Sequence, residues 1–172
     1  NLDVKKQIIE IKKVKSKKLL VGAAVGAGSE EIKRAKALLK ENIDMIVVDT
    51  AHGHTKKVAE IIRKIRKIKP KKTVLCAGNI ATPEAAKFLA SLGVDVIKVG
   101  IGPGSICTTR LVAGIGMPQL SAILSVRKGL GNKNIKIIAD GGIKFSGDIP
   151  KALAAGADAV MIGSLFAGTD EA

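Results

Sequence analysis

Six short runs of apolar residues recur along the chain, and each is followed by a polar or glycine-rich stretch. The runs are rich in Val, Ile, Leu and Ala and show little of the alternation of a half-exposed strand. Nearly continuous apolar runs of this length are typical of strands buried on both faces of a parallel sheet. They predict strands over residues 19–25, 45–48, 73–77, 94–99, 135–139 and 159–162.

Between these runs, apolar side chains recur every three or four residues, which is the period of an amphipathic helix. The clearest stripe lies within residues 55–68. Asp3, Ser29 and Thr82 stand where N-caps are expected, and Pro83 suits the first helical position. The predicted helices cover residues 1–15, 29–40, 55–68, 82–93, 118–127 and 149–155.

Alternating strands and helices imply right-handed crossovers and a parallel sheet, either doubly wound or closed as a (β/α)8 barrel. Polar or glycine residues end the strands at Asp49, Asn79, Gly100, Asp140 and Gly163. In a barrel these ends form one face that can surround one ligand, so we expect an α/β fold of the TIM-barrel type. A closed barrel needs eight strands, so we expect an incomplete barrel of about six βα units.

Composition narrows the class of protein. The chain has 172 residues, 47% hydrophobic and only 2% aromatic, so Ile, Val, Leu and Ala must fill its core. The net charge is +14, but the lysines fall on predicted helices with no aromatic residues among them to stack bases, which disfavours a nucleic-acid surface. No apolar run reaches membrane-spanning length, and the two cysteines form no CxxC motif, so we expect a cytoplasmic protein.

A glycine-rich loop follows the fourth predicted strand and carries the chemistry-bearing residues Ser105 and Cys107. It reads Val-Gly-Ile-Gly-Pro-Gly-Ser-Ile-Cys-Thr-Thr over residues 99–109 and is followed by Arg110. Such a loop can turn carbonyls toward a cation or N–H groups toward an anion. A thiol beside N–H dipoles and a cation can become a nucleophilic thiolate. The alternative is a strand-to-helix turn whose cysteine is a small buried hydrophobe.

The ends of the last two predicted strands are suited to phosphate. Asp140, Gly141 and Gly142 follow one strand, and Gly163 and Ser164 follow the other. Barrels often bind phosphate at the loops after strands seven and eight, and Asp140 could then accept hydrogen bonds from ribose hydroxyls. The alternative is that these glycines form ordinary tight turns and that Asp140 caps a helix.

Asp49, His52 and His54 also lie at a strand end, which invites a metal hypothesis. The sequence offers no further His, and no Cys or Glu is placed to complete a ligand set. An aspartate that contacts a cofactor hydroxyl, or one that caps the next helix, is favoured instead.

Five motifs together resemble the IMP dehydrogenase and GMP reductase family, over nearly the whole chain. Three segments look more like the dehydrogenase branch, whereas the cysteine loop is common to both: Asp49-Thr-Ala-His-Gly53, Ala139-Asp-Gly-Gly-Ile-Lys144 and residues 163–170. The five motifs are Gly100-Ile-Gly-Pro-Gly-Ser-Ile-Cys-Thr-Thr-Arg110, Gly116-Met-Pro-Gln119, Ile138-Ala-Asp-Gly-Gly-Ile143, Ser146-Gly-Asp148 and Met161-Ile-Gly-Ser-Leu165.

The resemblance implies a tetrameric (β/α)8 barrel that oxidises IMP to XMP with NAD and uses K⁺, with this chain supplying strands three to eight. Cys107 would form a thioimidate with the purine, and Thr109 would help place the substrate or water. The implied IMP-binding residues are Ser105, Asp140, Gly141, Gly142, Gly163 and Ser164. The implied NAD-binding residues are Asp49, Thr50, Ala51, Asn79, Gly100, Ile101 and Gly102. The implied K⁺ ligands are the carbonyls of Gly102, Gly104 and Cys107.

The chain departs from the family pattern in three places. The first two barrel strands are absent, and so is the pair of CBS modules that most members insert between about residues 16 and 17 of this chain. The flap arginine that acts as base toward water would lie beyond residue 172, so the whole chain is expected to be a partial catalytic barrel domain. GMP reductase and a non-catalytic nucleotide-binding barrel fragment remain as alternatives.

Overall fold

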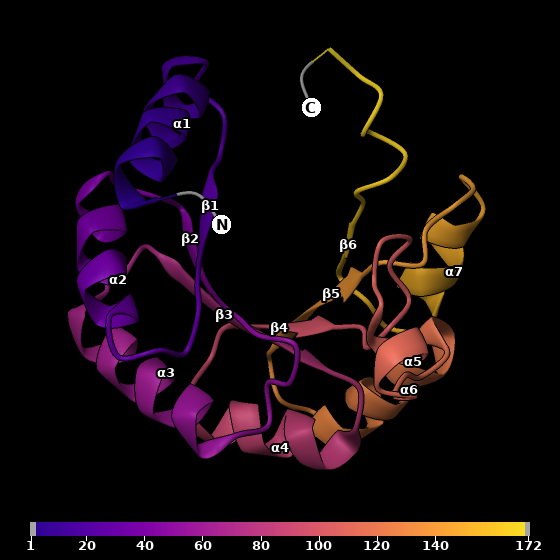
Figure 1. The fold of residues 1–172 in the computed structure, drawn as a ribbon. Helices are drawn as coiled ribbons and strands as arrows, with labels where there is room; N and C mark the ends of the chain where they lie inside the picture. The colour runs from indigo at the N-terminus through magenta and orange to yellow at the C-terminus, as the bar shows by residue number, and fades with distance from the viewer. Residues whose placement is uncertain (1–2, 171–172) are drawn as a thin grey trace.

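The computed structural model describes residues 3–170 and shows a single six-stranded parallel sheet in the order β1-β2-β3-β4-β5-β6. Each strand pairs with the next strand in sequence, so every connection is a crossover. The sheet curls, and the helices cover its outer side from α1 round to α7 (Figure 1). The strands are β1 Gly22–Val25, β2 Met45–Asp49, β3 Val74–Ile80, β4 Val96–Val99, β5 Lys136–Asp140 and β6 Ala159–Met161.

Six helices follow the predicted periodicity, and a seventh short helix, α5, lies in a segment for which none was predicted. The apolar stripe within residues 55–68 is confirmed for Val58, Ile61, Ile62 and Ile65, which are buried, whereas Ile68 at its end is 37% exposed. The helices are α1 Val4–Ser16, α2 Glu31–Lys40, α3 Lys56–Ile68, α4 Pro83–Ser91, α5 Thr109–Val112, α6 Gln119–Leu130 and α7 Asp148–Ala154. The expected α/β barrel architecture of six βα units is therefore confirmed.

Helix starts follow local chemistry in two predicted places and not in a third. The side chains of Asp3 and Thr82 accept hydrogen bonds from backbone N–H groups in the first turns of α1 and α4. The Ser29 cap is wrong: Glu30 occupies the N-cap position of α2, and its side chain makes no capping bond. The Glu31 carboxylate turns back instead and accepts the Gly26 N–H at 2.9 Å, which ties the helix to the end of β1.

The two faces of the sheet differ in what they bury. The large core lies between the sheet and the helices and includes Ile97 and Val99 of β4. The inner face carries a smaller apolar cluster built on Val47, Cys76 and Val96. Because successive side chains of a strand alternate between faces, Lys98 lies on the inner face above Val96, toward the carboxyl ends of the strands. No helix in the described part of the chain has the length and apolar character that crossing a bilayer requires.

Candidate functional site

Charged side chains from three strands meet at the carboxyl end of the sheet. Asp49 ends β2, Lys98 lies in β4 and Asp140 ends β5. The Lys98 Nζ lies 2.6 Å from Asp140 Oδ2 and 3.0 Å from Asp49 Oδ1. Lys98 is only 5% exposed, so its ammonium depends on these two carboxylates for compensation of its charge.

The register of the strands explains how one lysine reaches both aspartates. Asp49 pairs with Gly78, and Gly78 pairs with Lys98, so a residue without a side chain stands between the two charged groups. A Cβ at Gly78 would lie 2.5 Å from the Lys98 carbonyl oxygen and 2.7 Å from the Lys98 Cβ. Glycine at this position therefore leaves the space that the Lys98 side chain crosses.

Two amide side chains complete the polar centre. The Asn79 Nδ2 donates to Asp140 Oδ2 at 2.9 Å and to the Gly100 carbonyl at 2.8 Å. The Gln119 Nε2 donates to the carbonyls of Val99 and Asp140, at 2.8 and 3.2 Å. Asn79 Oδ1 and Gln119 Oε1 are buried and have no hydrogen-bond partner within residues 3–170. Each is a free acceptor beside the strand ends.

The cysteine loop holds its thiol close to hydrogen-bond donors. Cys107 Sγ lies 3.3 Å from Thr109 Oγ1, and Thr109 opens the short helix α5. Hydrogen bonds from the hydroxyl and the backbone N–H of Thr109 lower the pKa of the Cys107 thiol, and the Gly102 N–H and the Arg110 charge act in the same direction. The thiol is half-buried and therefore accessible, as a nucleophile requires.

The second cysteine provides a contrast within the same chain. Cys76 is fully buried on the inner face, and burial raises the pKa of its thiol to about 12. A thiol in this environment stays protonated and behaves as a small apolar side chain. Of the two cysteines, only Cys107 therefore combines access with a stabilised thiolate.

Two adjoining cavities are lined by the residues that the sequence analysis singled out. The larger, about 620 Å³, lies at the ends of β5 and β6 and is lined by all six residues expected for IMP. The smaller, about 240 Å³, is lined by Cys107, Thr109 and all seven residues expected for NAD. Asp140 lines both cavities, so a ligand in the larger cavity lies next to the cavity that contains the cysteine.

Glycines shape the wall between these cavities. Gly100 and Gly102 have φ angles of +150° and +82°, and a Cβ at Gly100 would collide with the Asp140 carbonyl oxygen. Gly141 also has positive φ, and its missing Cβ would lie 3.1 Å from the Gly104 nitrogen. The cysteine loop therefore lies so close to the β5 end, through the Gly104 backbone and the Pro103 ring, that a side chain at Gly141 would have little room.

The expected K⁺ ligands lie in the same loop, whereas the two histidines lie elsewhere. Carbonyl oxygens are the ligands that K⁺ takes in proteins. The Gly104 carbonyl accepts the Cys107 N–H at 3.2 Å and keeps a second lone pair, so this donor set fits a monovalent cation. His52 and His54 line a separate, largely apolar cavity, and the His54 ring lies 4.5 Å from the Phe88 ring.

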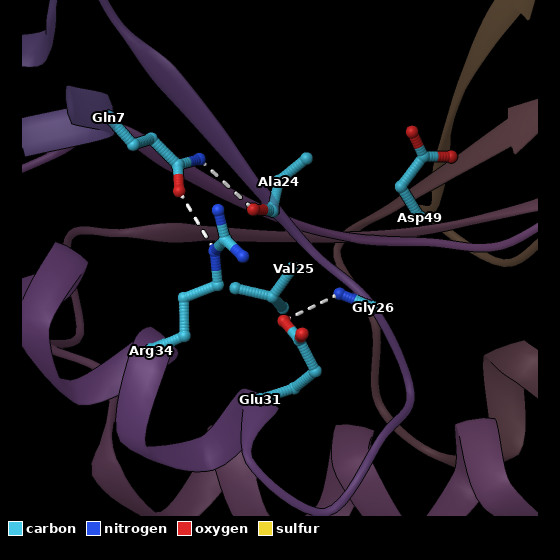
Figure 2. A pocket seen from close by; sticks show the side chains of 7 residues that line it. All are labelled: Gln7, Ala24, Val25, Gly26, Glu31, Arg34 and Asp49. Carbon is cyan, nitrogen blue, oxygen red and sulfur yellow. Dashed lines mark hydrogen bonds between the residues drawn. The ribbon is translucent and has the colours of Figure 1, made fainter. Parts of the chain in front are cut away.

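A further cavity of about 300 Å³ lies on the other side of Asp49, between α1, the end of β1 and α2 (Figure 2). The Gln7 Nε2 donates to the Ala24 carbonyl at 3.1 Å, and Arg34 Nε donates to Gln7 Oε1 at 2.9 Å. These contacts join α1 and α2 to the end of the first strand. They fix one wall of this cavity.

Sequence reasoning gave no role to two residues that the structure places in this centre. Gln119 was noted only within a motif, and its amide holds the β4 and β5 ends together. Lys98 was not singled out, although a lysine in a strand of Val and Ile residues is a visible signal. Lysine is almost never fully buried unless it is paired, so its position indicates inward-facing carboxylates.

Comparison with known proteins identifies the family. The whole chain, residues 1–172, matches the family described as "IMP dehydrogenase / GMP reductase domain". The chain belongs to this family. It is 58% identical over 154 residues to inosine-5'-monophosphate dehydrogenase of Chlorobaculum parvum, and 52% identical over 171 residues to that of Chlorobaculum tepidum. The corresponding protein of Borreliella burgdorferi is also 58% identical over 154 residues.

These alignments cover most of this chain and a smaller part of each relative. They include 90% of the chain for C. parvum and B. burgdorferi and 99% for C. tepidum. The same alignments cover 31%, 38% and 34% of the relatives, so the chain spans about a third of their length. The expected family membership is confirmed, and the matched segment includes the cysteine loop and both cavities.

Proposed function

We propose that the protein containing this chain is an IMP dehydrogenase, which oxidises IMP to XMP with NAD as the hydride acceptor. The observation that carries the proposal is that Asp140 belongs to both cavities. A nucleotide whose phosphate occupies the ends of β5 and β6 and whose ribose reaches Asp140 has its base directed toward Cys107. The names of the aligned relatives support the same reaction.

The substrate half of the site would use backbone and hydroxyl donors for the phosphate. Gly141, Gly142, Gly163 and the hydroxyls of Ser105 and Ser164 line the larger cavity. N–H groups of glycine-rich strand ends are suitable for a phosphate, which carries no group that needs an acceptor. Asp140 would accept hydrogen bonds from the ribose hydroxyls and fix the position of the base.

The chemical step needs a nucleophile that is also a leaving group. The Cys107 thiolate would add to C2 of the hypoxanthine, and C2 would then release its hydrogen as hydride to NAD. Water would add to the resulting thioimidate, and the C2–S bond would break to give XMP and regenerate the thiolate. Hydrogen bonds from Thr109 that lower the pKa of Cys107 favour the thiolate at both stages.

The second nucleotide would occupy the cavity that holds the cysteine. Asp49, Thr50 and Ala51 line one side of it, and Asn79 and residues 100–102 line the other. The free Asn79 Oδ1 offers an acceptor for a hydroxyl or a carboxamide N–H. Carbonyls of Gly102, Gly104 and Cys107 would hold a K⁺ ion, which would fix the loop conformation. As in the family, we propose a homotetramer.

Thiol labelling tests the proposal directly, because the two cysteines serve as test and reference in one protein. IMP is expected to slow iodoacetamide alkylation of Cys107 in the intact protein, as measured by mass spectrometry of each cysteine peptide. Cys76 is expected to stay unlabelled, because it is buried and its thiol pKa is about 12. Equal Cys107 rates with and without IMP would count against the proposal.

An activity assay separates the two branches of the family. An IMP dehydrogenase reduces NAD in the presence of IMP, whereas a GMP reductase oxidises NADPH in the presence of GMP. We expect the first activity in the intact protein. Turnover of GMP alone would assign the site to the reductase instead.

A further inference from the structure

One buried ammonium stands between carboxylates that belong to two different nucleotide sites. Asp49 lies on the side proposed for NAD, and Asp140 lies on the side proposed for IMP. Each carboxylate has an oxygen within 3.0 Å of the same Lys98 nitrogen. Two negative charges are therefore held close together with a single positive charge between them.

Among residues 3–170, the structure shows no further carboxylate paired with Lys98. On the β3 side it faces Gly78, which has no side chain, and Cys76, whose thiol stays neutral because burial raises its pKa to about 12. On the β5 side, Ile138 is its register partner and Asp140 follows two residues later. The other polar side chains that line the same cavity are those of Thr50, Asn79, Thr109 and Cys107.

The ammonium is a permanent charge in this setting. Burial alone would lower the pKa of Lys98, but its hydrogen bonds and charge interactions with Asp140 and Asp49 outweigh burial and raise the pKa. The side chains of Asp49 and Asp140 are 46% and 23% exposed, so both keep a side open to a ligand while Lys98 itself is covered. Lys98 lines the smaller cavity but is only 5% exposed, so it acts on a ligand mainly through the two carboxylates.

We propose that Lys98 is a positioning residue that allows the two nucleotide sites to be filled at the same time. Its ammonium holds both carboxylates beside their cavities and offsets the repulsion between them, so that each can accept hydrogen bonds from one ribose. This role rests on the proposed function, because it requires that both cavities bind nucleotides.

Without the Lys98 ammonium, we expect nucleotide binding at one site to weaken binding at the other. Two carboxylates at short distance repel each other, and without the Lys98 cation nothing between them offsets that repulsion. A nucleotide that fixes one carboxylate in its cavity would then make it harder to hold the other carboxylate nearby, so the first nucleotide would weaken binding of the second. If Lys98 only supported the fold, its loss would weaken nucleotide binding at both sites without making the two nucleotides compete.

The test uses Cys107→Ala protein, in which IMP and NAD can be bound together without reaction. Calorimetry gives the IMP dissociation constant with and without saturating NAD, and the ratio of the two constants measures the coupling. We expect Lys98→Met in this background to shift the ratio toward competition by about tenfold or more, the scale of one uncompensated charge pair. Lys98→Arg should restore most of the coupling, because it retains the charge.

A matched control is Lys69, which follows α3 and contacts Asp95, the residue before β4. Lys69 Nζ lies 3.7 Å from Asp95 Oδ2, its side chain is 12% exposed, and it also donates to the Thr73 carbonyl. Lys69→Met should lower the melting temperature and leave the coupling ratio unchanged. If Lys98→Met does not fold, Lys98→Gln provides the same comparison with a polar, neutral side chain.

The outcomes separate the two proposals. If Cys107→Ala protein binds both nucleotides and the coupling ratio is the same with and without Lys98, the role of Lys98 is wrong and the proposed function stands. If that protein binds neither IMP nor NAD, both proposals are overturned. A ratio that shifts equally in Lys69→Met would also overturn the role of Lys98, because it would reflect general destabilisation.

Discussion

The two ends of the sheet use aspartate in opposite ways. At the amino ends, Asp44, Asp95 and Asp158 each stand one residue before a strand, at β2, β4 and β6. Each carboxylate accepts the backbone N–H at the start of the neighbouring strand, which closes an otherwise open position of the ladder. The three donors are the N–H groups of Val21, Leu75 and Ile137, at 2.9, 2.8 and 2.9 Å.

Each of these amino-end carboxylates also faces a basic side chain. Lys15, Lys69 and Arg127 approach Asp44, Asp95 and Asp158 at 3.3, 3.7 and 2.6 Å. With backbone and side-chain partners together, such a carboxylate has its hydrogen-bonding capacity largely used within the fold. The repetition at three strand starts indicates a structural device rather than a site.

The carboxyl ends leave aspartate oxygens available. Asp49 and Asp140 contact Lys98, and Asp140 also contacts Asn79, but no backbone N–H donates to either carboxylate group in the described chain. Their remaining lone pairs face cavities. The comparison agrees with the general division of a barrel, in which the carboxyl-end face binds ligands and the amino-end face provides stability.

The largest effect should come from removing the nucleophile at the carboxyl-end face. Cys107→Ala in the intact protein is expected to reduce turnover by about 10³-fold or more, because no other thiol in this chain can replace it. The melting temperature should change little, since the side chain is half-buried and small. NADH absorbance and a thermal melt measure the two effects. Residual turnover near the wild-type rate would remove Cys107 from the mechanism.

A smaller loss is expected when a ligand-facing carboxylate is neutralised. Asp140→Asn should raise the IMP dissociation constant by about 10- to 100-fold, since hydrogen bonds to a charged group weaken. Lys98 would keep Asp49 as a partner, so the fold should persist. Calorimetric titration with IMP tests this. Unchanged affinity with a large drop in melting temperature would place Asp140 with the structural aspartates.

The sequence predicts the residues at the carboxyl ends of the strands better than those at the amino ends. The strand ends could be found because an apolar run stops at a polar residue, and parallel strands bring all such stops to one face. Cys107, Asp49 and Asp140 were located in this way, and the structure brings them to adjoining cavities. The three aspartates that precede strands resemble one another in sequence. Their hydrogen-bond donors are backbone N–H groups at a neighbouring strand, which the sequence around each aspartate does not show.

The contacts that the sequence did not predict depend on how the strands and helices are placed relative to one another. Lys98 contacts Asp49 two strands away only because Gly78 lies between them, and no local pattern specifies that pairing. The Ser29 cap failed for a related reason, since Glu31 accepts the backbone N–H of Gly26, just after β1, and so ties the start of α2 to that strand. Local propensity predicts elements, whereas contacts between elements decide their ends and their charged partners.

The smallest effect should come from the amino-end face and should appear in stability alone. Asp158 is partly buried, and although burial raises the pKa of its carboxyl, hydrogen bonds from the Ile137 N–H, Arg127 and Lys136 outweigh burial and lower it. Asp158→Asn is expected to cost about 1 to 2 kcal/mol of unfolding free energy, the difference between charge-assisted and neutral hydrogen bonds. The IMP dissociation constant should not change.

The sign of the pH dependence sharpens this last prediction. A carboxyl whose pKa is lower in the folded than in the unfolded state contributes its full stability above the unfolded value, about pH 4, and loses it as the pH falls through the folded value. Denaturant unfolding at several pH values should therefore show the gap between wild type and Asp158→Asn at pH 6 to 7 and its closure in acid, because the wild-type carboxyl is then protonated too. A gap that widens in acid, or an altered IMP affinity, would show that the two ends of the sheet do not divide stability and binding between them.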